Sequence, residues 1–261
     1  MTDNDNLVLV RTERRGEAGN VAYITANNPS KRNAIGMDGK RAIVAAFRRL
    51  CEDEKLRVVV LTGAGDKSFI AGADIAEMKD LTRDQAEEEH SLTHYACDAI
   101  RQCAVPVIAR INGYCLGAGM ELAASCDLRA AADHANFGMP EVRVGIPSGM
   151  QAALLPSLVG WGRAAELVLT GDIFDAREAY QFGFVQKLVP AAELDAAVEK
   201  WIQSILVSGP RAVRLQKKLM RDWERLPLED AIQAGIQACL EARRTDEPKR
   251  MMEAFLSRKK K

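Results

Sequence analysis

The sequence predicts an α/β core followed by a smaller helical lobe. Short β-branched runs alternate with helical patterns through the first two thirds of the chain, an order typical of α/β domains. After Val189 the strand signal ends and only helical patterns follow. A length of 261 residues, of which 48% are hydrophobic, suffices for one large core with an added lobe.

The core contains five runs that are predicted as strands, at residues 7–11, 21–25, 57–62, 105–111 and 128–132. Helices are predicted between them at residues 37–53 and 82–103. In the first helix, Ile43, Phe47 and Leu50 recur at three- and four-residue spacing. This spacing places them on one helix face, turned toward a core.

The lobe is predicted from four further helical patterns, at residues 191–208, 210–223, 228–243 and 248–260. Pro210 suits a first helical turn, and Pro227 and Pro248 separate the later patterns. We therefore divide the chain into an α/β core, residues 1–195, and a C-terminal helical lobe, residues 196–261.

Charge and cysteine content limit the partners and the location. Lys plus Arg number 36 and Asp plus Glu number 36, so the net charge predicts binding neither to nucleic acid nor to an anionic membrane. No apolar stretch approaches the roughly 20 residues that span a bilayer. The six cysteines form no CxxC pair, and residues 1–6 lack signal or transit features. We expect a cytoplasmic protein with reduced thiols.

A glycine turn within residues 67–78 is the first candidate ligand site. An apolar strand end leads into Gly72, and Asp74 stands at the start of a predicted helix. A small residue at such a corner lets a ligand approach the backbone N–H groups. An ordinary strand-helix turn capped by Asp74 explains the pattern equally well.

Residues 111–121 repeat this design, with Gly117-Ala118-Gly119 between a buried strand and a helical pattern at 120–126. Free N–H groups and the dipole at a helix start favour a developing negative charge. If both turns face one cavity, the N–H groups of Ala73 and Ala118 form an oxyanion hole for a thioester oxygen. A close helix-packing contact is the alternative, because glycine patterns alone are weak evidence.

Two glutamates follow these turns in apolar surroundings. Glu121 lies among Met120, Leu122 and alanines, and Glu141 lies in the run Phe137-Gly-Met-Pro-Glu141. Solvated or paired glutamates are the common case, and Arg143 is an obvious partner for Glu141. Held near one carbonyl-binding site, however, two carboxylates can divide acid and base work, with apolar walls raising at least one pKa.

Three segments in this order resemble the crotonase (enoyl-CoA hydratase/isomerase) family and its enoyl-CoA hydratases in particular. They are Ala71-Gly-Ala-Asp-Ile75, Asn112-Gly-Tyr-Cys-Leu-Gly-Ala-Gly-Met-Glu121 and Phe137-Gly-Met-Pro-Glu141. The similarity extends from about residue 7 to the C-terminus. It implies a crotonase fold of repeated ββα superhelical turns with a C-terminal helical trimerisation lobe, in a homotrimer or homohexamer.

The resemblance also implies residue roles. Ala73 and Ala118 match the backbone donors of the oxyanion hole, where one donor is worth roughly 3 kcal/mol. Glu121 and Glu141 match the catalytic glutamates that hold the attacking water. Glu121 is expected to act as the base on this water, and Glu141 to deliver a proton to the α-carbon. The substrate is an acyl-CoA thioester, and no separate cofactor is expected.

Contacts to coenzyme A are also implied by similarity. Lys31 or Arg32 is expected at the phosphates, and Phe255 and Arg258 match a C-terminal phenylalanine and basic residue that close over the CoA. A solvated basic tail is the alternative for Arg258. The nucleotide groove is expected along Ala73 to Ala76. The substrate-binding residues implied with it are Ala71, Gly72, Ala73, Asp74, Ile75 and Ala76, together with Gly117 and Ala118.

The sequence departs from the family pattern after the second glutamate. Many hydratases carry a stretch reading roughly Gly-Gly-Thr-Gln-Arg-Leu, whereas this chain has Pro147-Ser-Gly-Met-Gln-Ala-Ala-Leu-Leu155. Acyl chain length and branching are therefore not predicted. A second, milder departure is Ala118 in place of a glycine, and its backbone N–H is retained.

Other chemistries have weaker support. His90 and His94 lie four residues apart on a predicted helix but lack a third ligand pattern, so no metal site is predicted. Ser148 is not in a GxSxG elbow. Within the family, dehydration of a 3-hydroxyacyl-CoA or a carnitinyl-CoA type substrate, and double-bond isomerisation, use the same oxyanion hole. Non-catalytic RNA or protein binding is a different class, and the neutral charge disfavours RNA.

Overall fold

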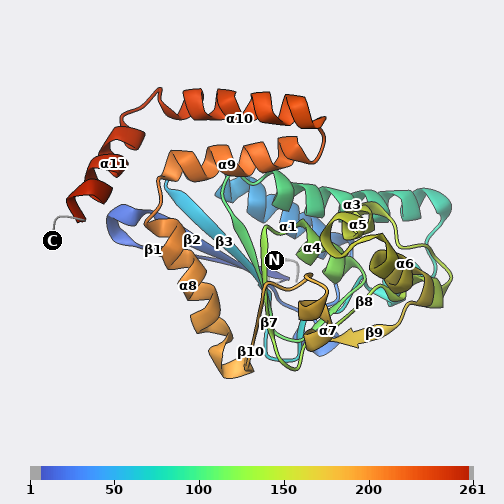
Figure 1. The fold of residues 1–261 in the computed structure, drawn as a ribbon. Coiled ribbons are helices and arrows are strands. Elements are labelled where there is room, and N and C mark those ends of the chain that lie inside the picture. The colour runs from blue at the N-terminus through green and yellow to red at the C-terminus, as the bar shows by residue number, and fades with distance from the viewer. Residues whose placement is uncertain (1–6, 259–261) are drawn as a thin grey trace.

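The computed structural model describes residues 7–258 and contains a six-stranded and a four-stranded sheet (Figure 1). The first two strands of the large sheet are antiparallel, and the other neighbouring pairs are parallel. Its strands, in spatial order, are β1 (Val8–Arg14), β2 (Asn20–Ala26), β3 (Leu56–Gly63), β5 (Val107–Ile111), β7 (Leu128–Ala132) and β10 (Lys187–Val189).

The small sheet is built from strands of three residues each. In spatial order they are β4 (Ser68–Ile70), β6 (Tyr114–Leu116), β8 (Asn136–Gly138) and β9 (Ile173–Asp175). Because β4, β6 and β8 directly follow β3, β5 and β7, the chain moves from the large sheet to the small sheet before each return. This order produces the repeated ββα turns that the resemblance implies.

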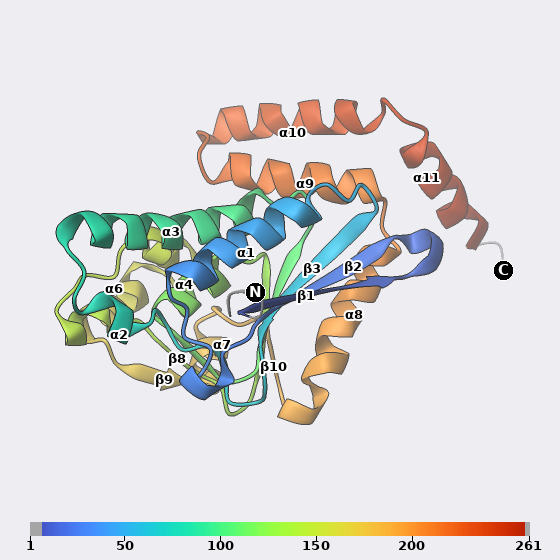
Figure 2. The same cartoon turned by 180° about the vertical axis from the view of Figure 1, so that it is seen from behind.

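Helices cover both faces of the large sheet, which explains why β3 is almost entirely buried. On one face lie α1 (Met37–Leu50) and α3 (Arg83–Gln102), side by side in Figure 2. Ile43, Phe47 and Ile100 enter the main core from these helices. The α8 helix (Leu194–Leu206) packs a second apolar cluster against the opposite face.

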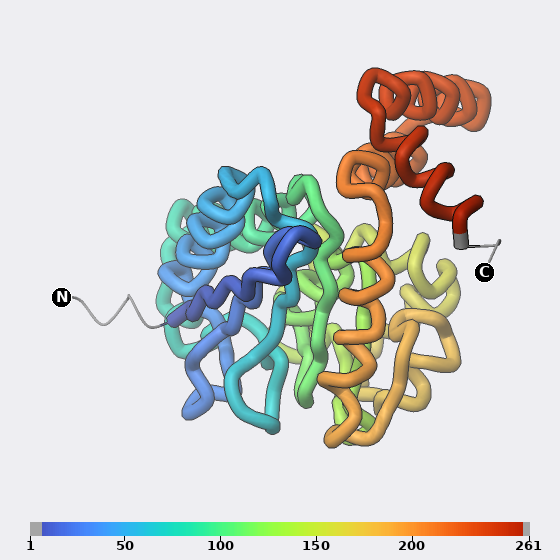
Figure 3. Tube along the Cα trace, turned by 90° about the vertical axis from the view of Figure 1, so that its left-hand side faces the viewer, coloured from blue at the N-terminus to red at the C-terminus, as the bar shows by residue number. Residues whose placement is uncertain are grey.

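The remaining helices flank the small sheet or form the C-terminal part. Beside the small sheet are α2 (Ile75–Met78), α4 (Ala118–Ser125), α5 (Leu155–Val159), α6 (Trp161–Thr170) and α7 (Ala176–Gln181). At the C-terminus are α9 (Pro210–Trp223), α10 (Leu228–Ala242) and α11 (Glu247–Arg258). In Figure 3, α10 and α11 stand away from the body of the molecule.

The α9 helix fastens the C-terminal part to the core. Lys217 is buried, and its ammonium group donates to the Val105 carbonyl at 2.9 Å and to the Asp127 carboxylate at 2.7 Å. Asp127 also accepts the Val107 N–H at 2.6 Å, so it joins α9 to β5. The predicted boundary after residue 195 falls inside α8, which packs on the large sheet, and the domain division stays a prediction.

Several predicted boundaries need correction. The strand expected at 105–111 begins at Val107, and the helix expected at 191–208 begins at Leu194 after a short 3-10 turn. The helix expected at 248–260 is α11, and its last two predicted residues lie outside the described residues. Within residues 7–258 no helix is long and apolar enough to cross a membrane.

Candidate active site

The first glycine turn connects β4 to α2 and is fixed by a neighbouring segment. The Ile35 N–H donates to the Gly72 carbonyl at 3.0 Å, and Ile35 and Ala73 form a parallel bridge. Gly72 has φ +112°, a conformation that favours glycine. The Asp74 side chain accepts the Ala76 N–H at 3.0 Å, so Asp74 caps α2 as expected.

The second glycine turn lies directly against the first. A methyl group added to Gly117 would lie 3.9 Å from the Gly72 Cα, and one added to Gly72 would lie 3.4 Å from the Leu116 carbonyl oxygen. A methyl group on Gly119 would lie only 2.0 Å from the Ile70 carbonyl oxygen. Gly119 is therefore the close packing contact considered above, and the turns at Gly72 and Gly117 meet.

Glu121 lies inside the protein, on a helix whose eight residues are all buried. Its side chain accepts the Ala152 N–H at 3.0 Å, and the residue is only 3% exposed. Burial raises its pKa to about 8, and the negative charge of Glu141 contributes in the same direction. The two carboxyl groups therefore lie close enough to repel each other.

Glu141 lies in a 3-10 turn, Pro140–Val144, and is half-buried. Its Oε2 accepts the Ser148 hydroxyl at 2.7 Å, and its Oε1 would lie 2.7 Å from a methyl group added to Gly117. The alternative pairing with Arg143 is wrong, because the Arg143 guanidinium bonds Asp172 and the Thr170 carbonyl instead. Glu141 thus lies over the second glycine turn.

The structure brings two carboxyl groups and two glycine turns to one place. Glu141 contacts the turn that carries Ala118. Glu121 follows Ala118 on α4 by less than one helical turn. At such a place, backbone N–H groups can stabilise an oxyanion while a carboxyl group moves a proton. The catalytic roles of these residues stay predictions.

Two of the expected CoA contacts lie beside the first turn. The Lys31 ammonium group pairs with the Asp74 carboxylate at 2.6 Å, which raises the pKa of Lys31, and its side chain remains 56% exposed. Arg32 stacks its guanidinium over the Tyr114 ring at 4.8 Å, and its carbonyl accepts the Ala71 N–H at 3.2 Å. A positive charge is therefore available at the mouth of this turn.

The other two expected contacts are not brought there within one chain. Phe255 is exposed on α11, and Figure 2 shows α11 at the opposite end of the molecule from α2. Arg258 is the last residue of α11. Within one chain, the structure therefore does not bring α11 to the first turn.

Sequence reasoning missed the hydrogen-bond donors to both carboxyl groups. Ser148 was considered only as a nucleophile, and Ala152 acts through its backbone N–H, which no side-chain motif reveals. The available signal was the unusual stretch after Glu141, which contains both residues.

The two histidines that were considered as metal ligands have separate partners. His90 lies 2.9 Å from Glu89, and His94 lies 2.9 Å from the Gln151 amide.

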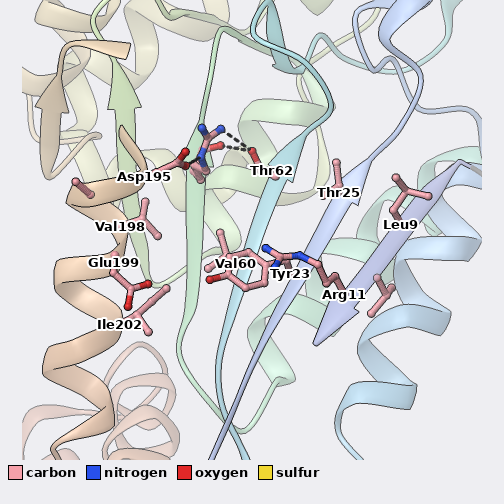
Figure 4. Close-up of a pocket in the computed structure, with 13 residues that line it drawn as sticks. Leu9, Arg11, Tyr23, Thr25, Val60, Thr62, Asp195, Val198, Glu199 and Ile202 are labelled. Carbon is pink, nitrogen blue, oxygen red and sulfur yellow. Dashed lines mark hydrogen bonds and ion pairs between the residues drawn. The ribbon is translucent and has the colours of Figure 1, made fainter. Parts of the chain in front are cut away.

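A cavity of about 630 Å³ lies elsewhere, between α8 and the large sheet (Figure 4). Two contacts within its lining join polar groups: Arg110 pairs with Asp195 at 2.5 Å, and Arg11 stacks over the Tyr23 ring at 4.3 Å. None of its lining residues belongs to the two glycine turns or is Glu121 or Glu141. Among residues 7–258, no group of three acids, cysteines or histidines is placed to hold a metal ion.

The repeated ββα turns, the helical C-terminal part and the acids beside the paired glycine turns define a protein of the crotonase fold. The family model described as enoyl-CoA hydratase/isomerase matches residues 16–261. The chain therefore belongs to the enoyl-CoA hydratase/isomerase family. All six cysteines carry free thiols.

Similar proteins match this chain over nearly its whole length. The crotonyl-CoA hydratase of Syntrophomonas wolfei is 37% identical over 98% of this chain and 96% of that protein. The short-chain-enoyl-CoA hydratase of Clostridium acetobutylicum is 35% identical, with 93% of each covered. The crystal structure of an enoyl-CoA hydratase from Bacillus anthracis has a TM-score of 0.90 and 32% identity, with 95% of this chain and 96% of that chain covered.

Proposed function

We propose that this protein is an enoyl-CoA hydratase, which adds water to a 2-enoyl-CoA to give a 3-hydroxyacyl-CoA. The observation that carries the proposal is the meeting of Glu121 and Glu141 at the paired glycine turns. The relatives named as crotonyl-CoA and short-chain-enoyl-CoA hydratases support this activity. The reaction would belong to fatty acid and lipid metabolism.

In this proposal, the backbone N–H groups of Ala73 and Ala118 hold the thioester oxygen. Both follow a glycine of positive φ, Gly72 and Gly117, so little side-chain bulk covers the approach. Ala118 is also the first residue of α4, where the helix dipole favours negative charge. Polarisation makes the β-carbon electrophilic and stabilises the enolate-like transition state.

The two carboxyl groups hold the attacking water and divide the proton transfers. Glu121 takes a proton from the water as its oxygen bonds to the β-carbon, and Glu141 gives a proton to the α-carbon. A pKa of about 8 suits a base at Glu121, because general acid–base catalysis works best when the pKa of the catalytic group lies near the working pH. In the free enzyme at neutral pH, only a minor fraction of Glu121 is ionised.

The nucleotide part of the CoA would lie along the first turn, toward Ala76, with its phosphates near Lys31 or Arg32. We propose that Phe255 and Arg258 reach the CoA from another copy, in a homotrimer or homohexamer. Exposed apolar side chains on the last helices support such an assembly: Leu228, Ile232, Ile236 and Leu240 on α10, and Met252 and Leu256 on α11. No separate cofactor is required, and free thiols suit a cytoplasmic enzyme.

The test is incubation of the purified protein with crotonyl-CoA and longer enoyl-CoAs, followed by the loss of the conjugated thioester absorbance. Glu121→Gln and Glu141→Gln should each lower kcat by about 100- to 10,000-fold, the range for a general acid or base. Binding of CoA should be largely unchanged. Glu87→Gln, at an exposed position on α3, is the control and should retain full activity. Full activity in both active-site variants would exclude this mechanism.

A further inference from the structure

The segment after Glu141 supplies one hydrogen bond to each carboxyl group. The Ser148 hydroxyl donates to Glu141 Oε2 at 2.7 Å, and the Ala152 N–H donates to Glu121 Oε1 at 3.0 Å. This is the stretch in which the sequence departs from the hydratase pattern. The departure therefore lies in contact with the proposed proton-transfer groups themselves.

The backbone of this segment is shaped to deliver both donors. Gly145 has φ +82°, and the Ile146 N–H donates to the Glu141 carbonyl at 3.2 Å, so the chain folds back over Glu141. Between the two donors, Met150 has φ +38°, an unfavourable conformation for a residue with a side chain. Such residues cost about 1 to 3 kcal/mol and persist where the surrounding contacts fix them. The hydrogen bonds of Ser148 to Glu141 and of Ala152 to Glu121 therefore fix the path of the chain between these two residues.

The Ser148 contact distinguishes the two oxygens of Glu141. Because the hydroxyl donates to Oε2, it favours placement of a proton carried by this carboxyl group on Oε1. Oε1 is the oxygen that lies against Gly117, beside the turn that carries Ala118. Without the hydroxyl, a half-buried glutamate in a loop regains rotamer freedom and both oxygens become available for the proton.

We propose that Ser148 is a positioning residue that directs the proton of Glu141 toward one face of the substrate α-carbon. The inference rests on the proposed hydratase function. In the step, Glu141 Oε1–H breaks and a C–H bond forms at the α-carbon, while the water oxygen bonds to the β-carbon and its proton passes to Glu121. Ser148 neither gains nor loses a proton and need not touch the substrate.

The experiment compares Ser148→Ala and Ser148→Thr with Ser157→Ala. Ser157 is an exposed serine nearby, whose hydroxyl donates to the Leu154 carbonyl at 2.8 Å. Crotonyl-CoA is hydrated in D₂O, and NMR of the product gives the configuration of deuterium at the α-carbon. Steady-state kcat and KM are measured for each protein, together with thermal unfolding.

The wild type and Ser157→Ala should place deuterium on one face of the α-carbon. Ser148→Ala should lower kcat by about 10- to 100-fold, as expected for a hydrogen bond to a carboxyl group that becomes charged as it gives up its proton, with KM changed less than about twofold. Its deuterium should be distributed over both faces. Ser148→Thr keeps the hydroxyl and should restore single-face labelling.

Single-face labelling with full kcat in Ser148→Ala would overturn the inference. So would a loss of kcat that follows a lower unfolding temperature and that Ser148→Thr fails to restore, because that combination marks a purely structural role. A wild type that hydrates no enoyl-CoA would instead refute the proposed function, on which the inference rests.

Discussion

The two carboxyl groups of the candidate site occupy opposite kinds of surroundings. Glu121 lies on α4, where all eight residues are buried, whereas Glu141 lies in a short 3-10 turn that has no buried residue. Glu121 accepts a hydrogen bond from a backbone N–H, and Glu141 accepts one from a side-chain hydroxyl.

The charge of Glu121 and the orientation of Glu141 therefore depend on separate physical causes. Exclusion of water sets the charge of Glu121, because burial is the largest contribution to its raised pKa. Glu141 is only half-buried, and its side-chain hydrogen bond comes from the Ser148 hydroxyl, which we propose fixes its orientation. Two chemically identical side chains can thus perform different proton transfers without any metal or cofactor in the proposed mechanism.

The largest expected effect concerns stability and the buried carboxyl group. The pKa of Glu121 is raised from 4.5 to about 8, which corresponds to on the order of 5 kcal/mol. Because the folded state binds the proton more tightly, stability from this group is present below pH 4.5 and is lost as the pH rises through 8. Glu121→Gln should remove this loss.

The measurement is the free energy of unfolding by urea at pH 5 and pH 9, for the wild type and Glu121→Gln. The variant should gain about 4 kcal/mol relative to the wild type between these two pH values, because an unfolded glutamate is already largely ionised at pH 5. An equal pH dependence in both proteins would mean that Glu121 is not strongly desolvated, and the contrast with Glu141 would fail.

A second prediction compares glycines from the same two regions. Gly119→Ala on α4 would place a methyl group 2.0 Å from the Ile70 carbonyl oxygen, so backbone must move. We expect a loss of about 3 kcal/mol in unfolding free energy. Gly149→Ala, in the loop after Glu141, meets no atom within 4 Å and should change stability by less than about 1 kcal/mol. Similar losses in both variants would show that the loop is packed as tightly as α4.

The elements that sequence patterns predicted well are long or sharply bounded. The strand at 128–132 matches β7, and the helix at 210–223 matches α9, which begins at Pro210 as expected. The four strands of the small sheet have three residues each, too few to display an alternating pattern. Only the resemblance implied the second sheet.

The candidate site was predictable where side-chain identity carries the signal. The two glutamates and the glycine turns are visible in the sequence, and the structure brings them together. The partner of Arg143 was not predictable, because Asp172 is 29 positions away and reaches it through the fold. The Ala152 donor was equally hidden, since every residue except proline has a backbone N–H.

The smallest expected effect is kinetic and decides which carboxyl group acts as the base. If Glu121 must be ionised to accept a proton from water, kcat/KM should rise about tenfold per pH unit below pH 8 and level off above pH 8. Between pH 6 and the plateau the change is about 100-fold. The measurement is kcat/KM for crotonyl-CoA from about pH 6 to about pH 10, which brackets the Glu121 pKa by about 2 on either side.

Cys51 provides the control for this assignment, because hydrogen bonding from Cys103 contributes most to lowering the pKa of its thiol to about 6. Cys51→Ser should leave the pH profile unchanged, since Cys51 is exposed at the end of α1 and lies outside the candidate site. A profile that falls as pH rises through 8 would assign the acid role to Glu121. The buried Glu121 would then deliver the proton, and the half-buried Glu141, which accepts the Ser148 hydroxyl, would activate the water.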